Sequence, residues 1–188
     1  MNEQFSFRPQ RKPNVIWIFG DQHRAHALSH RGDPNVFTPN IDNLARNGTC
    51  FDRAVAGAPW CSPFRGALLT GTYPHQNGVT QTPSPLAPTI PTVANPFNEA
   101  GYHTAYVGKW HVDGSNAREH YVPPERRGDF QYWMGYENNN NQHEVYVYGS
   151  EGETPRRLEE YETDGLTSML LTHLKGHVEG EEDYQPFF

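Results

Sequence analysis

The sequence predicts an α/β fold in which a mostly parallel sheet is sandwiched by helices. The first observation is the run Asn14 to Asp21, "NVIWIFGD", which is short, continuously apolar and rich in β-branched and aromatic residues. Such a run is typical of a strand buried on both faces, as in a parallel sheet covered by helices. The second observation is that strand-like and helix-like segments alternate after it, which favours helical connections between strands. With 188 residues, the chain is long enough for one domain with a substantial core.

The next two elements follow from local signals. A helix is expected over residues 38–48, because Thr-Pro is a typical helix start and Asn-Gly a typical stop. One face of this helix would carry Ile41, Leu44 and Ala45. The segment Thr49 to Ala56, "TCFDRAVA", is then expected to form a second strand.

The middle of the chain alternates in the same way. Ser62 to Thr70 predicts another helix, which Gly71 would end. A loop follows, marked by Pro83, Pro85, Pro88 and Pro91. A weak helix is expected from Thr92, although Pro96 interrupts it. The segment Tyr102 to His111, "YHTAYVGKWH", predicts a strand that runs into a loop.

Beyond His111 the chain is polar and irregular. Residues 137–148, "ENNNNQHEVYVY", are expected to form a loop that leads into a short strand. Residues 163–176 predict an amphipathic helix with a buried side made of Leu166, Met169, Leu170 and Leu174. The chain closes on Pro186-Phe187-Phe188, the expected beginning of another buried strand. Since a domain rarely ends where an apolar strand begins, residues 1–188 are expected to be the N-terminal part of something longer.

Composition narrows the class of partner. The net charge of -7 and the pI near 5.8 argue against nucleic acid or an anionic membrane as the main partner. An anionic substrate would therefore need a local cluster of positive charge. Two cysteines, Cys50 and Cys61, are too few for a disulfide framework. The first residues lack an apolar signal-peptide core and no run could span a bilayer, so a cytoplasmic protein is expected.

The stretch "WCSPFRGALLTG", Trp60 to Gly71, places a cysteine and an arginine around a proline where a helix starts. A free cysteine is most often a small buried hydrophobe. Here Pro63 favours a helix start, which puts Cys61 at the positive end of the helix dipole, where N–H groups favour an anion. Arg65 adds a forked donor suited to sulfate or phosphate oxygens. A thiolate phosphatase is not favoured, because the loop between cysteine and arginine is too short and its proline removes a donor.

The same stretch resembles the sulfatase signature, C-x-P-x-R followed by a short helix and Leu-Thr-Gly. Two further motifs stand in the order of that family: "PNVIWIFGDQ" is similar to its first strand and "EAGYHTAYVGKWH" to its "GKWH" segment. The resemblance covers most of the first 111 residues and implies an alkaline-phosphatase-like fold, with residues 1–188 as the N-terminal part of the catalytic domain. It also implies that a formylglycine-generating enzyme converts Cys61 to formylglycine, an aldehyde whose hydrate is the nucleophile.

A metal site is expected at the end of the first predicted strand. Asp21 lies where α/β sheets place their ligand sites, although it could also cap the following turn. By resemblance, Asp21, Gln22 and Cys61 would contact a divalent cation, with Ca²⁺ expected because it is a hard ion that takes oxygen ligands. Many relatives have an aspartate where Gln22 stands, so this site carries one negative charge fewer. An Asp-Gln pair also occurs in related phosphonate monoester hydrolases, which leaves the substrate class open.

Other histidines are given smaller roles. A group nearby consists of His23, His26 and His30, and the last two have the i,i+4 spacing that can bind zinc. Neither a third ligand nor a metalloprotease glutamate accompanies them, so a solvated or substrate-facing cluster is expected. His75 falls in a family-like position and is expected to support the structure around the site.

Lys109 and His111 alternate about Trp110, so on an extended segment both side chains would point the same way. Without further context they would be an ordinary surface pair. By resemblance, Lys109 binds a sulfate oxygen, while His111 contacts the diol and acts as a base when sulfate is expelled. The family's remaining metal ligands, its leaving-group histidine and its second lysine have no convincing equivalents after His111, so the expected site is incomplete.

The first hypothesis is a sulfuric ester hydrolase that cleaves sulfate monoesters of small molecules or carbohydrates. Its catalytic residues would be Cys61, Arg65, Lys109 and His111. One alternative is a phosphonate monoester or phosphodiester hydrolase on the same scaffold. Another is a non-catalytic fragment that binds anions or metal. The alcohol part of the substrate and the oligomeric state do not follow from the sequence.

Overall fold

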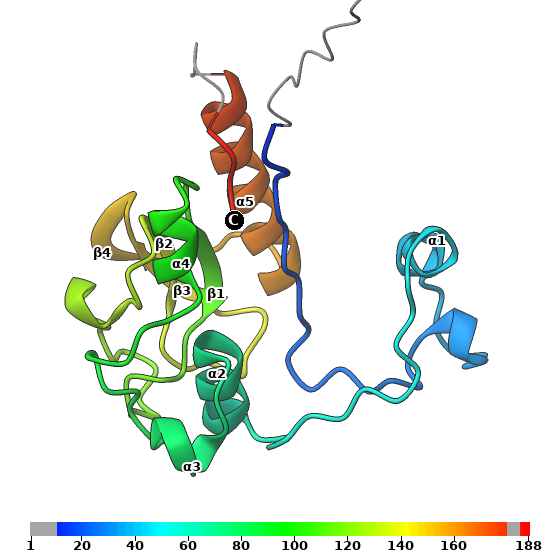
Figure 1. The fold of residues 1–188 in the computed structure, drawn as a ribbon, viewed down its shortest axis with the longest axis horizontal. Helices are drawn as coiled ribbons and strands as arrows, with labels where there is room; N and C mark the ends of the chain where they lie inside the picture. The colour runs from blue at the N-terminus through cyan, green and yellow to red at the C-terminus, as the bar shows by residue number, and fades with distance from the viewer. Residues whose placement is uncertain (1–10, 180–184) are drawn as a thin grey trace, which may run out of the picture. The chain divides into compact units, whose positions relative to one another are not determined.

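A computed structural model describes residues 11–179 and 185–188 (Figure 1). The chain divides into two compact units. The larger unit combines the segment that ends at Trp17 with residues 58–188, and the smaller unit consists of Ile18–Gly57. Each unit is described by itself.

The smaller unit contains a 3-10 helix η1, Ser29–Arg31, and a helix α1, Pro39–Asn47. The helix predicted in this region is confirmed to within one residue at each end. Asp42, in the first turn of α1, accepts hydrogen bonds from the hydroxyls of Ser29 at 2.7 Å and Thr38 at 2.9 Å. These bonds tie η1 to α1 and, with that of Ser29 the largest cause, lower the pKa of Asp42 to about 2.

The strand predicted over residues 49–56 is wrong. The structure has no strand there, and the side chain of Val55 is 89% exposed. A strand is stabilised by backbone hydrogen bonds to a neighbouring strand, and residues 18–57 contain no strand to pair with. The apolar pattern of this segment therefore does not decide its backbone conformation.

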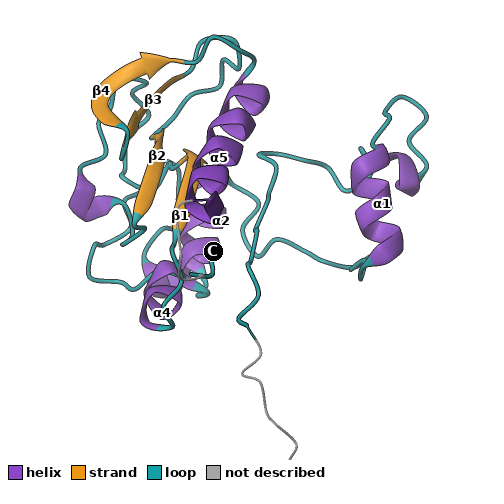
Figure 2. Cartoon of the chain, turned by 90° about the horizontal axis from the view of Figure 1, so that it is seen from above, coloured by secondary structure: helices purple, strands orange, loops and turns teal. Residues whose placement is uncertain are grey.

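A four-stranded mixed sheet lies in the larger unit (Figure 2). Its strands lie side by side in chain order: β1 Ala105–Lys109, β2 Tyr132–Tyr136, β3 Tyr146–Gly149 and β4 Gly152–Arg157. β1 and β2 are parallel, whereas β3 and β4 are added antiparallel. The α/β class is confirmed. The predicted strands at 102–111 and after the asparagine-rich loop appear as β1 and β3, while β2 and β4 were not predicted.

One face of the sheet packs against residues of helix α2, Cys61–Thr70. Leu69 of this helix belongs to the same buried cluster as Trp133 of β2. The predicted end of α2 is confirmed: Gly71 has a left-handed backbone, with φ of 66°, and donates its N–H to the carbonyl of Ala67 at 2.9 Å.

Helix α5, Glu162–Glu179, belongs to the other face. Met169 of α5 is buried in one cluster with Met134 of β2, the neighbour of Trp133. Successive residues of β2 thus enter opposite layers, as the pleat of a strand requires. The predicted helix is confirmed, and its three leucines on the expected buried side are half-buried: Leu166, Leu170 and Leu174.

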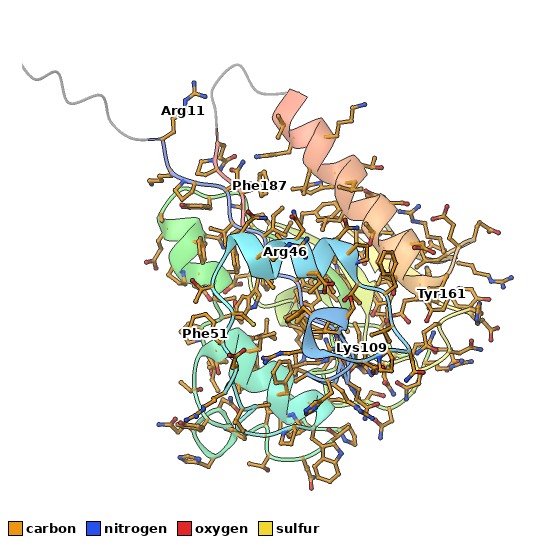
Figure 3. The ribbon with its side chains drawn as sticks, turned by 90° about the vertical axis from the view of Figure 1, so that its right-hand side faces the viewer. Arg11, Arg46, Phe51, Lys109, Tyr161 and Phe187 are labelled. Atoms are coloured by element: carbon orange, nitrogen blue, oxygen red, sulfur yellow. The ribbon has the colours of Figure 1, made fainter. Side chains whose placement is uncertain are left out.

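The last described residues extend the sheet beyond β1. Phe187 forms a parallel bridge with His103, and Ala105 donates its N–H to the carbonyl of Phe188 at 2.7 Å. The strand beginning that was expected here is confirmed. On the other side of this segment, Val15 donates its N–H to the carbonyl of Phe187 at 2.9 Å. Figure 3 shows Phe187 beside the segment that follows Arg11.

The strand predicted over residues 14–21 is not formed as such. Beyond Val15 the side chains are exposed except that of Phe19, which is half-buried, and Ile18 reaches 81%. A strand buried on both faces needs helices over its apolar side chains, and the described elements do not cover these ones. The segment is extended next to Phe187, but it is not a core strand within the part of the chain described here.

Short helices complete the larger unit: α3 Pro74–Asn77, α4 Ala94–Glu99 and the 3-10 helix η2 Pro124–Arg126. The weak helix predicted from Thr92 is α4, and Pro96 lies in its first turn, where a missing N–H costs little. Across the described ranges, no helix is both long and apolar enough to cross a membrane.

Candidate active site

Cys61 is the first residue of α2 and is half-buried. Trp60 before it is extended, so the chain turns into the helix at the thiol. The N–H of Ser62 donates to the hydroxyl of Thr82 at 3.2 Å, and Pro63 has no N–H. Two of the amide positions expected to face an anion are thus unavailable for that purpose. The nearby side chain that can offer positive charge is Arg65.

Arg65 lies one turn after Cys61 and is only 5% exposed. Its Nη1 donates to the hydroxyl of Tyr106 at 3.3 Å and to the backbone carbonyl of Lys109. The Tyr106 hydroxyl donates to the same carbonyl at 2.5 Å. These bonds connect helix α2, which begins at Cys61, with the end of β1 at Lys109.

Lys109 and His111 leave the end of β1 as a pair. Trp110 between them is buried in the hydrophobic cluster, but His111 has a left-handed backbone with φ of 54°, so the extended segment on which the predicted alternation depends ends before His111. Lys109 is 7% exposed and donates from Nζ to Oδ1 of Asn140 at 3.2 Å. His111 is 3% exposed, and its Nε2 lies 3.3 Å from Oδ1 of Asn116. Asn116 is therefore the hydrogen-bond partner of the imidazole at Nε2.

The asparagines that meet this pair belong to one group of loops. Asn138 and Asn140 follow β2, and Asn138 donates from Nδ2 to the carbonyl of Asn116 at 3.3 Å. Because β1 and β2 are parallel, their carboxyl ends lie at the same edge of the sheet, where α/β proteins place ligand sites. Sequence reasoning treated the asparagine run as an ordinary solvated loop. What sequence reasoning missed is the position of the run: it directly follows β2, which is parallel to β1, so it lies at the same edge of the sheet as Lys109.

Glu137 is a further residue that the sequence did not single out. It follows β2 directly and its side chain has no exposed surface. Oε1 accepts hydrogen bonds from the backbone N–H groups of Asp113 at 2.9 Å and Ser115 at 3.2 Å. Burial raises the pKa of Glu137 above the usual range of a carboxyl group. The acid therefore holds the turn that connects His111 with Asn116.

The expected metal ligands are divided between the units. Asp21 and Gln22 are exposed residues of the smaller unit, and Gln22 has a left-handed backbone with φ of 56°. Cys61 belongs to the larger unit, so a shared site of these three residues stays a prediction. Over residues 11–179 and 185–188, no group of three His, Cys, Asp or Glu side chains is arranged to hold a metal ion.

The other histidines have local partners. His23 lies with Nε2 3.1 Å from the carbonyl of Ala27, and His30 pairs with Asp42 at 3.2 Å between Nδ1 and Oδ1. His75 is exposed and its ring stacks on that of Tyr73, with centroids 5.8 Å apart.

The sheet and the helices on its two faces are of the alkaline-phosphatase-like α/β class. A family model described as Sulfatase matches residues 13–188. The chain belongs to the sulfatase family.

Named relatives agree. An ulvan-active sulfatase of Formosa agariphila is 36% identical over 94% of this chain and 34% of its own length. An endo-4-O-sulfatase of Bacteroides thetaiotaomicron is 30% identical over 94% of this chain and 41% of its own length. A solved structure of a protein in complex with its substrate D-glucosamine-2-N,6-O-disulfate is 27% identical, with a TM-score of 0.77 over 94% of this chain and 33% of that chain. The chain thus spans about a third to two fifths of these proteins.

Proposed function

We propose that the full-length protein hydrolyses sulfate monoesters of carbohydrates, and that this chain supplies the nucleophile and much of the sulfate-binding side. The observation that carries the proposal is the hydrogen bond from Arg65 to the carbonyl of Lys109. It joins the start of the signature helix to the "GKWH" segment, so two of the three motifs of the family are in contact. The names of the relatives support carbohydrate sulfates as the substrate class.

Arg65 and Lys109 are assigned to the sulfate oxygens. Both side chains are almost completely buried, and electrostatic interactions are stronger where water is excluded. Arg65 is fixed by its bonds to β1, so its guanidinium is already oriented before a substrate arrives. Lys109 would exchange its bond with Asn140 for a bond to a sulfate oxygen. Together they would neutralise charge on the transferring group.

Position 61 is assigned to the nucleophile. A sulfate group transferred to an ordinary serine or cysteine would remain as a stable ester. One hydroxyl of an aldehyde hydrate at this position attacks sulfur and displaces the alcohol of the ester. Deprotonation of the second hydroxyl then breaks the bond from carbon to the sulfate oxygen, which expels sulfate and regenerates the aldehyde. His111 is the proposed base for that second step, and its Nε2 would first release Asn116.

Asp21 and Gln22 are assigned to a divalent cation. Their side chains offer a carboxylate and a carboxamide oxygen, which are hard donors of the kind that Ca²⁺ prefers, and both are exposed in the smaller unit. When bound, a divalent cation would supply positive charge and would lower the pKa of a hydroxyl that coordinates it.

The test uses the full-length protein produced with and without a formylglycine-generating enzyme. Peptide mass should show sulfur exchanged for oxygen, with loss of two hydrogens, on the peptide that contains Cys61. Turnover of carbohydrate sulfates and aryl sulfates should require this modification. Cys61→Ala should abolish turnover. Equal activity with the unmodified thiol would contradict the proposal. A clear preference for aryl phosphonate esters would instead assign the protein to the phosphonate hydrolases of the same scaffold.

A further inference from the structure

Glu137 is a carboxyl group placed where carboxyl groups are rarely found. Its side chain is completely buried, and Oε2 has no hydrogen-bond partner among the residues described. A buried carboxyl group is costly unless its oxygens accept hydrogen bonds, so an apolar side chain of similar length would fit this position at lower cost. A purely structural requirement for packing does not explain an acid here.

The bonds of Glu137 explain what the acid does. Oε1 accepts from the N–H groups of Asp113 and Ser115, two residues of the turn that follows β1. The same turn needs an unusual backbone: His111 is left-handed with φ of 54°, and Gly114 with φ of 87°. Such a conformation is unfavourable for a non-glycine residue unless the surroundings hold it in place. From its buried position, Glu137 accepts hydrogen bonds from two N–H groups of this turn and so stabilises its conformation.

The turn connects two residues whose side chains are in contact, His111 and Asn116. His111 stands at its beginning and Asn116 just after it, and the two side chains meet at 3.3 Å. The opposite side of the turn is fixed by Asp113, whose carboxylate accepts from His120 at 2.6 Å and from Arg126. The turn that begins at the strained residue His111 is therefore held by two acids, the fully buried Glu137 and Asp113, whose side chain is 5% exposed.

We propose that Glu137 is a positioning residue for His111. Its acceptor oxygen holds the 111–115 turn in the conformation that directs the imidazole of His111 to the same edge of the sheet as Lys109. Glu137 itself touches no substrate. This inference rests on the proposed function for its catalytic consequence, but its structural part stands independently.

Two substitutions distinguish the role of Glu137 as a hydrogen-bond acceptor from its role in packing. Glu137→Gln keeps an acceptor oxygen in place of Oε1 and removes the charge, whereas Glu137→Met keeps the length and removes the acceptor. Glu137→Met leaves the N–H groups of Asp113 and Ser115 without this acceptor, so circular dichroism first checks that both full-length variants fold. Glu137→Gln should turn over close to the wild-type rate. Glu137→Met should lose roughly 10²-fold in kcat, part of the contribution of a positioned base, with little change in KM.

The decisive readout is the covalent intermediate. If His111 assists the expulsion of sulfate, its misplacement slows that step after the first transfer has occurred. Intact mass during turnover should then show sulfated enzyme accumulating in Glu137→Met, as in His111→Ala, but not in Glu137→Gln. Glu153→Met is the control, because Glu153 accepts its hydrogen bonds from Tyr121 and Arg127 and not from the 111–115 turn. It should show no accumulation.

A second readout does not depend on activity. Hydrogen exchange at the N–H groups of Asp113 and Ser115 should be faster in Glu137→Met than in the wild type and nearly unchanged in Glu137→Gln. Unchanged exchange in Glu137→Met, or equal loss of kcat in both variants, would overturn the inference. If the wild-type protein carries the aldehyde but cleaves no sulfate ester, the proposed function is wrong. The role of Glu137 in holding the turn would still be decided by the hydrogen-exchange measurement.

Discussion

Nη1 of Arg65 donates a hydrogen bond to the backbone carbonyl of Lys109, across 44 residues of chain. The arginine comes from the first turns of α2 and the carbonyl from the last residue of β1. A guanidinium that is fixed in this way loses little further freedom when it binds an anion. The guanidinium of the C-x-P-x-R motif is thus oriented by the backbone carbonyl of Lys109, a contact that the sequence motif does not predict.

Arg65→Lys should lower sulfate ester turnover by roughly 10²–10³-fold, the usual effect of removing one pre-organised donor from an active site. Lysine keeps the charge but replaces the planar, five-donor guanidinium, whose Nη1 donates to both Tyr106 and the carbonyl of Lys109, with a single ammonium group. The measurement is kcat/KM of the full-length, aldehyde-bearing enzyme. Tyr106→Phe is the control, since it keeps Arg65 and its bond to the carbonyl. Retention of full activity by Arg65→Lys would show that charge alone suffices.

Gly66→Ala should destabilise the protein by about 1–3 kcal/mol, the usual cost of overpacking a core. A Cβ at Gly66 would lie 2.8 Å from Cβ of Val79, which is fully buried and cannot yield easily. Gly176→Ala in α5 is the matched control, because a Cβ there meets nothing within 4 Å. It should stabilise the helix by about 0.5–1 kcal/mol through helix propensity alone. Urea unfolding of the two variants should give opposite signs.

Helix α2 could be predicted almost residue by residue, because its signals are local. Pro63 stands in the first turn and Gly71 provides the left-handed residue that ends it. Strand β2 escaped prediction because all five of its residues are buried, so it shows no alternation of apolar and polar side chains. Strand β4 escaped for the opposite reason: all its residues are exposed, and it contains Pro155.

The candidate site shows the same division. Cys61, Arg65, Lys109 and His111 could be proposed from motifs, since each motif lies within a few residues of chain. Their supporting contacts could not, because they join residues far apart: Glu137 reaches back more than 20 residues to the turn after β1. The strand predicted over residues 14–21 is wrong for a related reason. Its apolar composition indicates burial, but burial depends on other elements packing over the segment, and composition does not show which elements do so.

Gln22→Asp should strengthen cation binding if Asp21 and Gln22 share a site. The substitution restores the negative charge that the glutamine lacks, and ligand charge is a main determinant of Ca²⁺ affinity, so a gain of roughly tenfold is expected. Calorimetric titration of the full-length protein after chelator treatment measures it. Gln22→Ala should weaken binding, and Asp21→Asn should weaken it more. Equal affinity in all three variants would place the cation elsewhere.

The stability of the larger unit should fall in mild acid because of His173. The ring of His173 stacks on Tyr132 with centroids 3.6 Å apart, and it faces His103 and His177, all on the side of the sheet that α5 covers. Burial, followed by repulsion from the two other histidines, lowers the pKa of His173 from 6.5 to about 4. The charged form is therefore disfavoured in the folded state.

The sign of the effect follows from proton uptake. Between pH 6.5 and about 4 the unfolded chain binds a proton at His173 that the folded chain does not, so the unfolding free energy decreases as the pH falls through this window. His173→Phe keeps the stacking on Tyr132 and removes the titration, so urea unfolding at pH 7 and pH 4.5 should differ less than in the wild type. His75→Phe, at an exposed histidine, should leave the difference unchanged. The same decrease in His173→Phe as in the wild type would assign the acid sensitivity to other groups.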